Sequence, residues 1–186
     1  LELRPGALHG APRMPVVQVE GVERADGAGE PTRGDTCHLD VVDADGMVIS
    51  ATPSGGWLQS SPAIDGLGFC LGTRAQMLWL EEGLTTSMAP GIRPRTTLSP
   101  SMALHDDGTV AAFGTPGGDQ QDSWQLSMLL GMGVLGLGPQ AAIDAPAWHT
   151  THLVSSFDPR VWEPGGLHVE SRLGADVIDE LRRRGH

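Results

Sequence analysis

Two short apolar segments on either side of an Asp/Gly turn constrain this chain more than any other feature. Residues 37–42 and 47–52 favour strands, and the letters DADG lie between them. Such a pattern is typical of an antiparallel β-hairpin. Residues 101–104 and 109–113, separated by DDG, predict a second hairpin of the same kind.

Helical patterns follow the hairpins. Residues 122–130 carry apolar side chains that are dense enough for burial against a sheet, among them Trp124 and Leu126. Residues 140–145 predict a short helix that ends before a proline, and 175–184 predict a helix with arginines at its C-terminus. Hairpins followed by helices predict an α+β fold, in which helices cover an antiparallel sheet.

Residues 1–35 differ in texture from the rest of the chain. They are rich in glycine, proline and small polar residues and predict a linker, with one apolar run at 16–19 that could form an edge strand. The folded domain is predicted at 36–186. Because a fold of this kind would be expected to continue with another strand, we expect the domain to be truncated at its C-terminal end.

Charge and hydropathy exclude several classes of partner. The net charge is -11 and the sequence contains no lysine, so a basic surface for nucleic acid or anionic membrane is not expected. The longest apolar stretch, 126–137, is too short and too rich in glycine to span a bilayer. The first residues lack a basic segment followed by an apolar one, and we therefore expect a cytoplasmic location.

Cysteine spacing and three familiar motifs do not support a cofactor or metal site. Cys37 and Cys70 form no CxxC pair and are predicted to be buried thiols. The G-x-G-x-x-G match at 131–136 follows a helix instead of a strand, which favours a loop that ends the helix over a dinucleotide site. The DADG turn lacks the other ligands of a calcium loop, and His149 and His152 lack a third metal ligand nearby.

The junction between the linker and the first strand offers one nucleophile. A threonine hydroxyl reacts poorly unless a base removes its proton. If the chain is cut between Asp35 and Thr36, the new α-amino group has a pKa of about 7.7–8.0 and can be that base. The alternative is a loop-to-strand junction in which the Thr36 hydroxyl makes a structural hydrogen bond.

Four ordered segments favour the first interpretation, in which Thr36 becomes the nucleophile after the chain is cut. They are TCHLDVVDADG at 36–46, RPRTTLSP at 93–100, GTPGG at 114–118 and DAPAWH at 144–149. In order and spacing they resemble the small-subunit motifs of the gamma-glutamyltranspeptidase family. That resemblance implies the four-layered αββα sandwich of N-terminal-nucleophile (Ntn) hydrolases, with this chain supplying the catalytic, small-subunit portion.

The same resemblance implies roles for particular residues. The precursor would cut itself when the Thr36 hydroxyl attacks the carbonyl of Asp35. Ser54, with Thr52 beside it, would orient the nucleophile. The partner implied is the large subunit of the same precursor, in a heterodimer that could form a higher oligomer, and no cofactor is implied.

The backbone N–H groups of Gly117 and Gly118 would then form the oxyanion hole, and glycine suits a close approach of backbone to substrate.

Departures from the family pattern bear on the substrate. Thr96 and Thr97 keep hydroxyls where the transpeptidases have two carboxylate-binding serines. The transpeptidases bind the glutamyl ammonium with an asparagine and an aspartate. Here the asparagine position carries Gly56, and the tract that contains the aspartate reads TRAQM at 73–77, which has no acidic residue and includes Arg74. An arginine favours an anion.

The stretches 34–43, 54–62, 67–74 and 114–122 resemble the oxamate amidohydrolase branch of the family. That resemblance predicts hydrolysis of a small anionic amide, oxamate to oxalate and ammonia. The alternatives are a gamma-glutamyl hydrolase or transpeptidase, an oxalyl-type hydrolase of secondary metabolism, and an unprocessed, inactive structural subunit. For Arg74 the alternative role is a surface ion pair.

Overall fold

The computed structural model describes residues 36–56, 61–157 and 159–186. These residues divide into two compact units. One, the loop unit, is the described part of Ser54–Thr96; the other, the hairpin–helix unit, consists of Thr36–Pro53 and Thr97–His186. The 16–19 edge strand predicted from the sequence lies outside the described residues.

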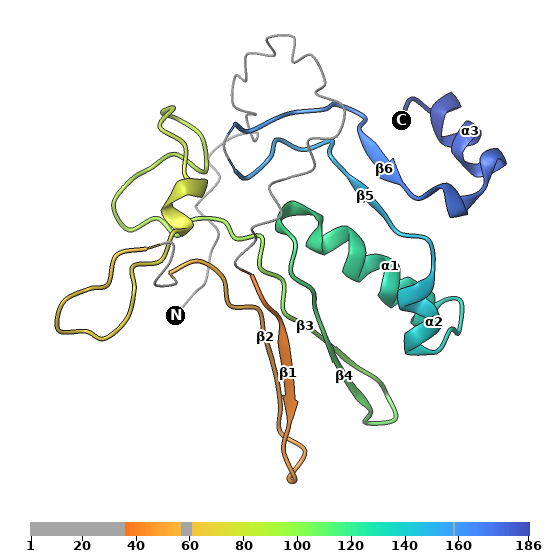
Figure 1. Cartoon of the computed structure of the whole chain (residues 1–186), viewed down its shortest axis with the longest axis horizontal. Coiled ribbons are helices and arrows are strands. Elements are labelled where there is room, and N and C mark those ends of the chain that lie inside the picture. Colours follow the sequence, from red (N-terminus) through yellow and green to blue (C-terminus); the bar gives the residue numbers. More distant parts are fainter. Residues whose placement is uncertain (1–35, 57–60, 158) are drawn as a thin grey trace. The chain divides into compact units, whose positions relative to one another are not determined.

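Strands of the hairpin–helix unit pair as three antiparallel hairpins (Figure 1). They are β1 (Leu39–Val42) with β2 (Val48–Ala51), β3 (Ser101–Leu104) with β4 (Val110–Phe113), and β5 (Trp148–Thr150) with β6 (Leu167–Val169). Both predicted Asp/Gly hairpins are confirmed, with strands somewhat shorter than expected. In the first turn, Asp43 Oδ1 accepts hydrogen bonds from the backbone N–H of Asp45 (2.9 Å) and of Met47 (2.8 Å).

The first two hairpins lie side by side. Strand β2 contacts β4, and Ser50 Oγ donates a hydrogen bond to the carbonyl of Phe113 (3.5 Å). Gly114 directly follows β4, and a Cβ at this position would lie 2.2 Å from Cε1 of His38. The imidazole of His38 therefore packs directly on the backbone where the 114–118 segment begins.

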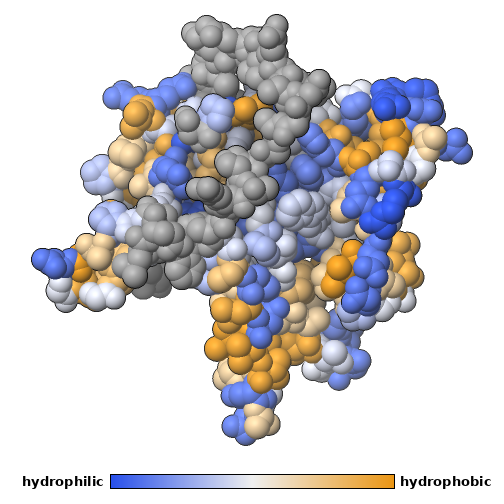
Figure 2. Space-filling model, in the orientation of Figure 1, coloured by the Kyte–Doolittle hydropathy of each residue, from blue (hydrophilic) through white to orange (hydrophobic). Residues whose placement is uncertain are grey.

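Both faces of the first hairpin carry exposed apolar side chains. Val41 and Ile49 point to one face and Val42 to the other, and their exposed fractions are 51%, 55% and 64%. Figure 2 shows orange, apolar residues on the side of this hairpin that faces the viewer. A strand that is apolar on both faces is typical of a sheet covered on both sides.

The helices occupy the second half of the hairpin–helix unit. They are α1 (Gln121–Gly133), α2 (Pro139–Asp144) and α3 (Ala175–Arg183), and all three were predicted from the sequence. Helix α1 packs on α2 and on β5 (Figure 1). Proline suits the first turn of α2, where its missing N–H would have no helical partner. In the described ranges, every helix is too short or too polar to cross a bilayer.

The prediction that the apolar side chains of α1 are buried was wrong. Helix α1 buries Gln121, Ser123 and Gln125, while Leu126 and Leu129 are 45% and 42% exposed. Gln121 and Gln125 are buried because their side chains bond to neighbouring loops, which periodicity along the helix does not reveal. The exposed leucines leave an apolar face on this part of the protein.

The loop unit contains little regular structure. A 3-10 helix, η1 (Arg74–Met77), and isolated bridges between Ala63 and Cys70 and between Trp79 and Ser87 organise its described residues. Met77 is fully buried at its centre. The sequence had predicted none of these elements.

The prediction of two buried thiols was also wrong. Cys37 is exposed and Cys70 is half-buried, and both are free. Cys37 lies two residues before β1, whose residues are all exposed, so its side chain has no core to enter.

The contact between the first two hairpins gives a stability test. Gly114→Ala is expected to lower the free energy of unfolding by about 1–3 kcal/mol, because the new Cβ overlaps the His38 ring. Denaturant unfolding monitored by circular dichroism measures this change. Gly133→Ala, at a helical position with open space around the added Cβ, is the matched control and should be neutral or slightly stabilising. Equal destabilisation of both variants would contradict the packing described.

Candidate active site

Thr36 lies at the start of the hairpin–helix unit, three residues before β1. The next residue, Cys37, donates its backbone N–H to the carbonyl of Pro53 (3.1 Å), which extends the pairing of β1 and β2 by a further step. Thr36 itself is half-buried. The predicted nucleophile is therefore held at the head of a paired strand and is not enclosed in a core.

His38 links Thr36's strand to its neighbours. Its Nδ1 lies 2.8 Å from Thr52 Oγ1, and its Nε2 lies 3.0 Å from Asp40 Oδ2. An ionised carboxylate only accepts, so in the neutral ring Nε2–H donates to Asp40 and Nδ1 accepts the hydroxyl proton of Thr52. Thr52, only 6% exposed, is thus fixed by the histidine two residues after Thr36.

The predicted oxyanion residues form a turn with positive φ values, which favours glycine. Gly117 and Gly118 have φ values of +128° and +46°. A Cβ on Gly117 would also lie 2.4 Å from the Trp124 ring. Among the described contacts, neither glycine N–H donates a backbone hydrogen bond, and the 3-10 turn Gly118–Gln120 leads directly into α1. Unpaired N–H groups at the start of a helix favour negative charge.

The two threonines predicted to bind the substrate carboxylate belong to different units. Thr97 belongs to the hairpin–helix unit and is 9% exposed, whereas Thr96 is exposed and belongs to the loop unit.

Two further predicted residues, Ser54 and Arg74, lie close together within the loop unit. A Cβ on Gly55 would lie 2.2 Å from Thr73 Oγ1, so the segment that starts at Ser54 packs on the residue before Arg74. Arg74 is half-buried at the start of η1. The structure therefore gathers Thr36, Thr52, Thr97 and the glycine turn in one unit, and Ser54, Arg74 and Thr96 in the other.

A row of rings connects the glycine turn to the last hairpin. Trp124, which fills the space beside Gly117, meets His149 edge-on with ring centroids 5.8 Å apart. His149 in turn stacks on His168 across β5 and β6 at 4.9 Å. The pKa of His149 is lowered, first because burial disfavours its charged form and second because a charge on His168 would repel it. His149 thus acts as a packing residue in a strand, and the described residues contain no group of three metal-ligating side chains.

Sequence reasoning missed His38 and Trp124. The Thr-x-His spacing was part of the first motif, but the histidine's role depends on Thr52 and Gly114, which are distant in sequence. Trp124 was interpreted as an ordinary core residue. Its position six residues after a Gly-Gly pair gave no signal of its own.

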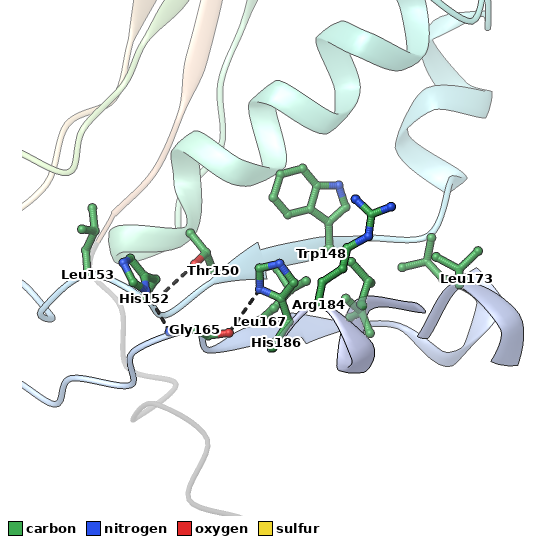
Figure 3. Close-up of a pocket in the computed structure, with 13 residues that line it drawn as sticks. Trp148, Thr150, His152, Leu153, Gly165, Leu167, Leu173, Arg184 and His186 are labelled. Atoms are coloured by element: carbon green, nitrogen blue, oxygen red, sulfur yellow. Dashed lines mark hydrogen bonds between the residues drawn. The ribbon is translucent and has the colours of Figure 1, made fainter. Parts of the chain in front are cut away.

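A separate apolar groove lies between the β5–β6 hairpin and α3 (Figure 3). Its volume is about 930 Å³, and Trp148, Leu167, Val177 and Leu181 are among its lining residues. His152 Nδ1 accepts the backbone N–H of Gly165 at one end (2.8 Å). The predicted site residues are not among the described side chains that line it.

Residues 9–186 match the family model described as gamma-glutamyltranspeptidase, which is nearly the whole chain. The chain belongs to the gamma-glutamyltranspeptidase family. Curated relatives of this gamma-glutamyltranspeptidase-family chain include the glutathione hydrolase-like YwrD proenzyme of Bacillus subtilis (strain 168). It is 31% identical over 159 residues, which cover 84% of this chain and 29% of that protein.

The oxamate amidohydrolase proenzyme of Klebsiella pneumoniae subsp. pneumoniae is 30% identical over 163 residues, covering 82% of this chain and 28% of that protein. Among solved structures, LmbA2991HD is 58% identical with a TM-score of 0.71, over 82% of this chain and 27% of that one. This family member therefore spans less than a third of the length of the curated relatives that it matches.

The lowered pKa of His149 predicts a pH dependence of stability. As the pH falls below about 6.5, the unfolded chain takes up a proton that folded His149 resists, so the free energy of unfolding should decrease. Chemical unfolding at a series of pH values from 8 to 5 measures this, with about 6.5 as the pH where the decrease begins. His149→Gln should flatten the decrease, whereas His105→Gln, at an exposed turn, controls for the loss of any histidine. An unchanged slope in His149→Gln would refute the assignment.

Proposed function

We propose that this chain is the catalytic portion of an Ntn amidohydrolase that cuts itself before Thr36. The observation that carries the proposal is the glycine turn: two N–H groups with a helix behind them lie in the same unit as the candidate nucleophile. Membership of the gamma-glutamyltranspeptidase family supports the assignment of Thr36 as that nucleophile.

The mechanism follows from these groups. The free α-amine of Thr36 takes the proton of its own hydroxyl, and Oγ attacks the amide carbonyl of the substrate. The N–H groups of Gly117 and Gly118 stabilise the resulting oxyanion, and each such donor is worth roughly 3–4 kcal/mol in related cases. The C–N bond then breaks, the amine of Thr36 returns the proton to the leaving nitrogen, and ammonia departs. Water attacks the remaining ester in the same way and releases a carboxylate.

Self-cleavage uses the same hydroxyl before the amine is free. Oγ of Thr36 attacks the carbonyl of Asp35, and the peptide bond shifts to an ester on the threonine. Water hydrolyses that ester, which leaves a carboxylate on Asp35 and a free amine on Thr36.

The apolar faces of the first hairpin support an αββα sandwich in the complete protein. Val41 and Val42 point to opposite faces of β1 and are both exposed in this chain. Burial of both faces would need additional layers, and we propose that the large subunit of the same precursor supplies them. Burying each valine would contribute roughly 1.5–3 kcal/mol.

For the substrate we propose a small amide with a carboxylate next to the scissile carbonyl, with oxamate as the first candidate. Arg74, together with the hydroxyls of Thr96 and Thr97, would bind the carboxylate. The name of the Klebsiella relative supports this choice. A gamma-glutamyl amide is the second candidate, because the Bacillus relative carries the name glutathione hydrolase-like.

The nucleophile is tested by Thr36→Ala in the full-length protein. This variant should show no cleavage between Asp35 and Thr36, and amide hydrolysis should fall roughly a thousandfold or more. Thr36→Ser keeps a hydroxyl and should retain both reactions at reduced rates. Denaturing gels with intact-mass measurement follow cleavage, and ammonia release follows turnover. An active enzyme with the Asp35–Thr36 bond intact would disprove the mechanism, and an uncut, inactive parent would support a structural subunit.

The substrate class is tested at Arg74. Arg74→Gln should raise KM for oxamate about tenfold or more with a smaller change in kcat, because a charged hydrogen-bond partner of the bound carboxylate is lost. Arg182→Gln, on the exposed surface of α3, is the matched control and should behave like the parent. Faster turnover of a gamma-glutamyl anilide than of oxamate by the parent would favour the second candidate.

A further inference from the structure

Gln121 is the most deeply buried polar residue at the start of α1, with 1% of its surface exposed. We assign its side-chain nitrogen to face two backbone carbonyls, because the hydrogen bonds made in this orientation are shorter than the 3.4 Å contacts that an oxygen there would make with the N–H and hydroxyl of Ser99. In this orientation Nε2 donates to the carbonyl of Thr115 (3.1 Å) and to that of Thr97 (3.0 Å). An amide nitrogen has two hydrogens, and here each hydrogen has one acceptor.

The two carbonyls belong to different parts of the proposed active site. Thr115 lies in the segment 114–118, two residues before the glycine turn. Thr97 carries one of the hydroxyls proposed to bind the substrate carboxylate. A single side chain thus connects the segment that receives the oxyanion to the segment that receives the carboxylate.

The other side of the glycine turn is also anchored. Asp119 accepts hydrogen bonds from the backbone N–H of Ser156 (2.7 Å) and from its hydroxyl (2.5 Å), and Ser156 is 1% exposed. Because this anchor fixes the turn from one side, the two bonds of Gln121 hold the Thr97 segment against it, alongside the bond from Gln125 to Ser99. Buried hydrogen-bonded networks favour a single geometry.

We infer that Gln121 is a positioning residue that sets the separation between the carboxylate-binding hydroxyl of Thr97 and the oxyanion turn, and thereby selects amides by chain length. The inference rests on the proposed function. A substrate whose carboxylate directly adjoins the scissile carbonyl fits one separation, and each additional methylene between them requires a longer one. Selectivity for the length of the substrate would therefore depend on Gln121 of α1, which does not itself contact the substrate.

The test uses the full-length, processed enzyme and three ω-amides that differ by one methylene each: oxamate, malonamate and succinamate. Gln121→Met keeps the length of the side chain and removes both donors. We expect kcat/KM for the best of the three amides to fall roughly tenfold to a hundredfold, as small misplacements do, and the preference among the three to shrink. Gln140→Met is the control, because Gln140 is an exposed glutamine of α2 whose side chain donates to Asp144 of the same helix (3.1 Å). It should keep the parent's order of preference.

A second variant separates positioning from folding. In Gln121→Glu an ionised carboxylate faces two carbonyls, but the protonated acid donates one hydrogen bond. At each pH, the preference of this variant among the three amides is compared with that of the parent. The preference should recover partly as the pH is lowered. A general loss of folded protein would not produce such a recovery. Thermal unfolding of each variant gives the folded fraction.

Two results overturn the inference. If Gln121→Met and Gln121→Glu keep the parent's preference among the three amides at every pH, or lose activity only in proportion to folded protein, then Gln121 does not set the separation. If the parent neither cuts itself before Thr36 nor hydrolyses any of the amides, the proposed function itself has failed, and the inference fails with it.

Discussion

The packing of one imidazole on one glycine holds together the part of the molecule on which the proposed chemistry depends. The His38 ring occupies the space that a side chain on residue 114 would need, and its nitrogens contact Thr52 and Asp40. The ring thereby joins the head of β1, the end of β2 and the end of β4. Without this contact, the position of Thr36 relative to the 114–118 segment would be set only by the weak side-by-side approach of two short hairpins.

The second constraint is the polar side of α1. Most helices on a sheet bury leucines and expose glutamines, whereas α1 does the reverse in the described chain. Gln121 and Gln125 are buried because loops on either side present carbonyl and hydroxyl groups to them. The interior beneath this helix is therefore ordered by directional hydrogen bonds, which specify loop geometry more narrowly than apolar contacts do.

Local chemistry in the sequence was enough to predict the two Asp/Gly hairpins and the three helices, because turn residues and helix ends are specified by neighbouring residues. The hairpin of β5 and β6 was not predicted, since 16 residues separate Thr150 from Leu167 and the pairing depends on a long connection. The buried face of α1 and the exposure of Cys37 likewise depend on which segments pack against them. Motif order identified the Gly-Gly turn, but the role of His38 required contacts across 14 residues or more.

The contact between the Gly117 backbone and the Trp124 ring has a consequence for how sequences of this kind can diverge. The indole occupies the volume that any larger residue at 117 would fill, and the φ of +128° penalises such a residue in addition. A smaller ring at 124 would relieve the overlap but leave a void above the backbone. We therefore expect substitutions at positions 117 and 124 to be linked, so that a change at one is tolerated only with a matching change at the other.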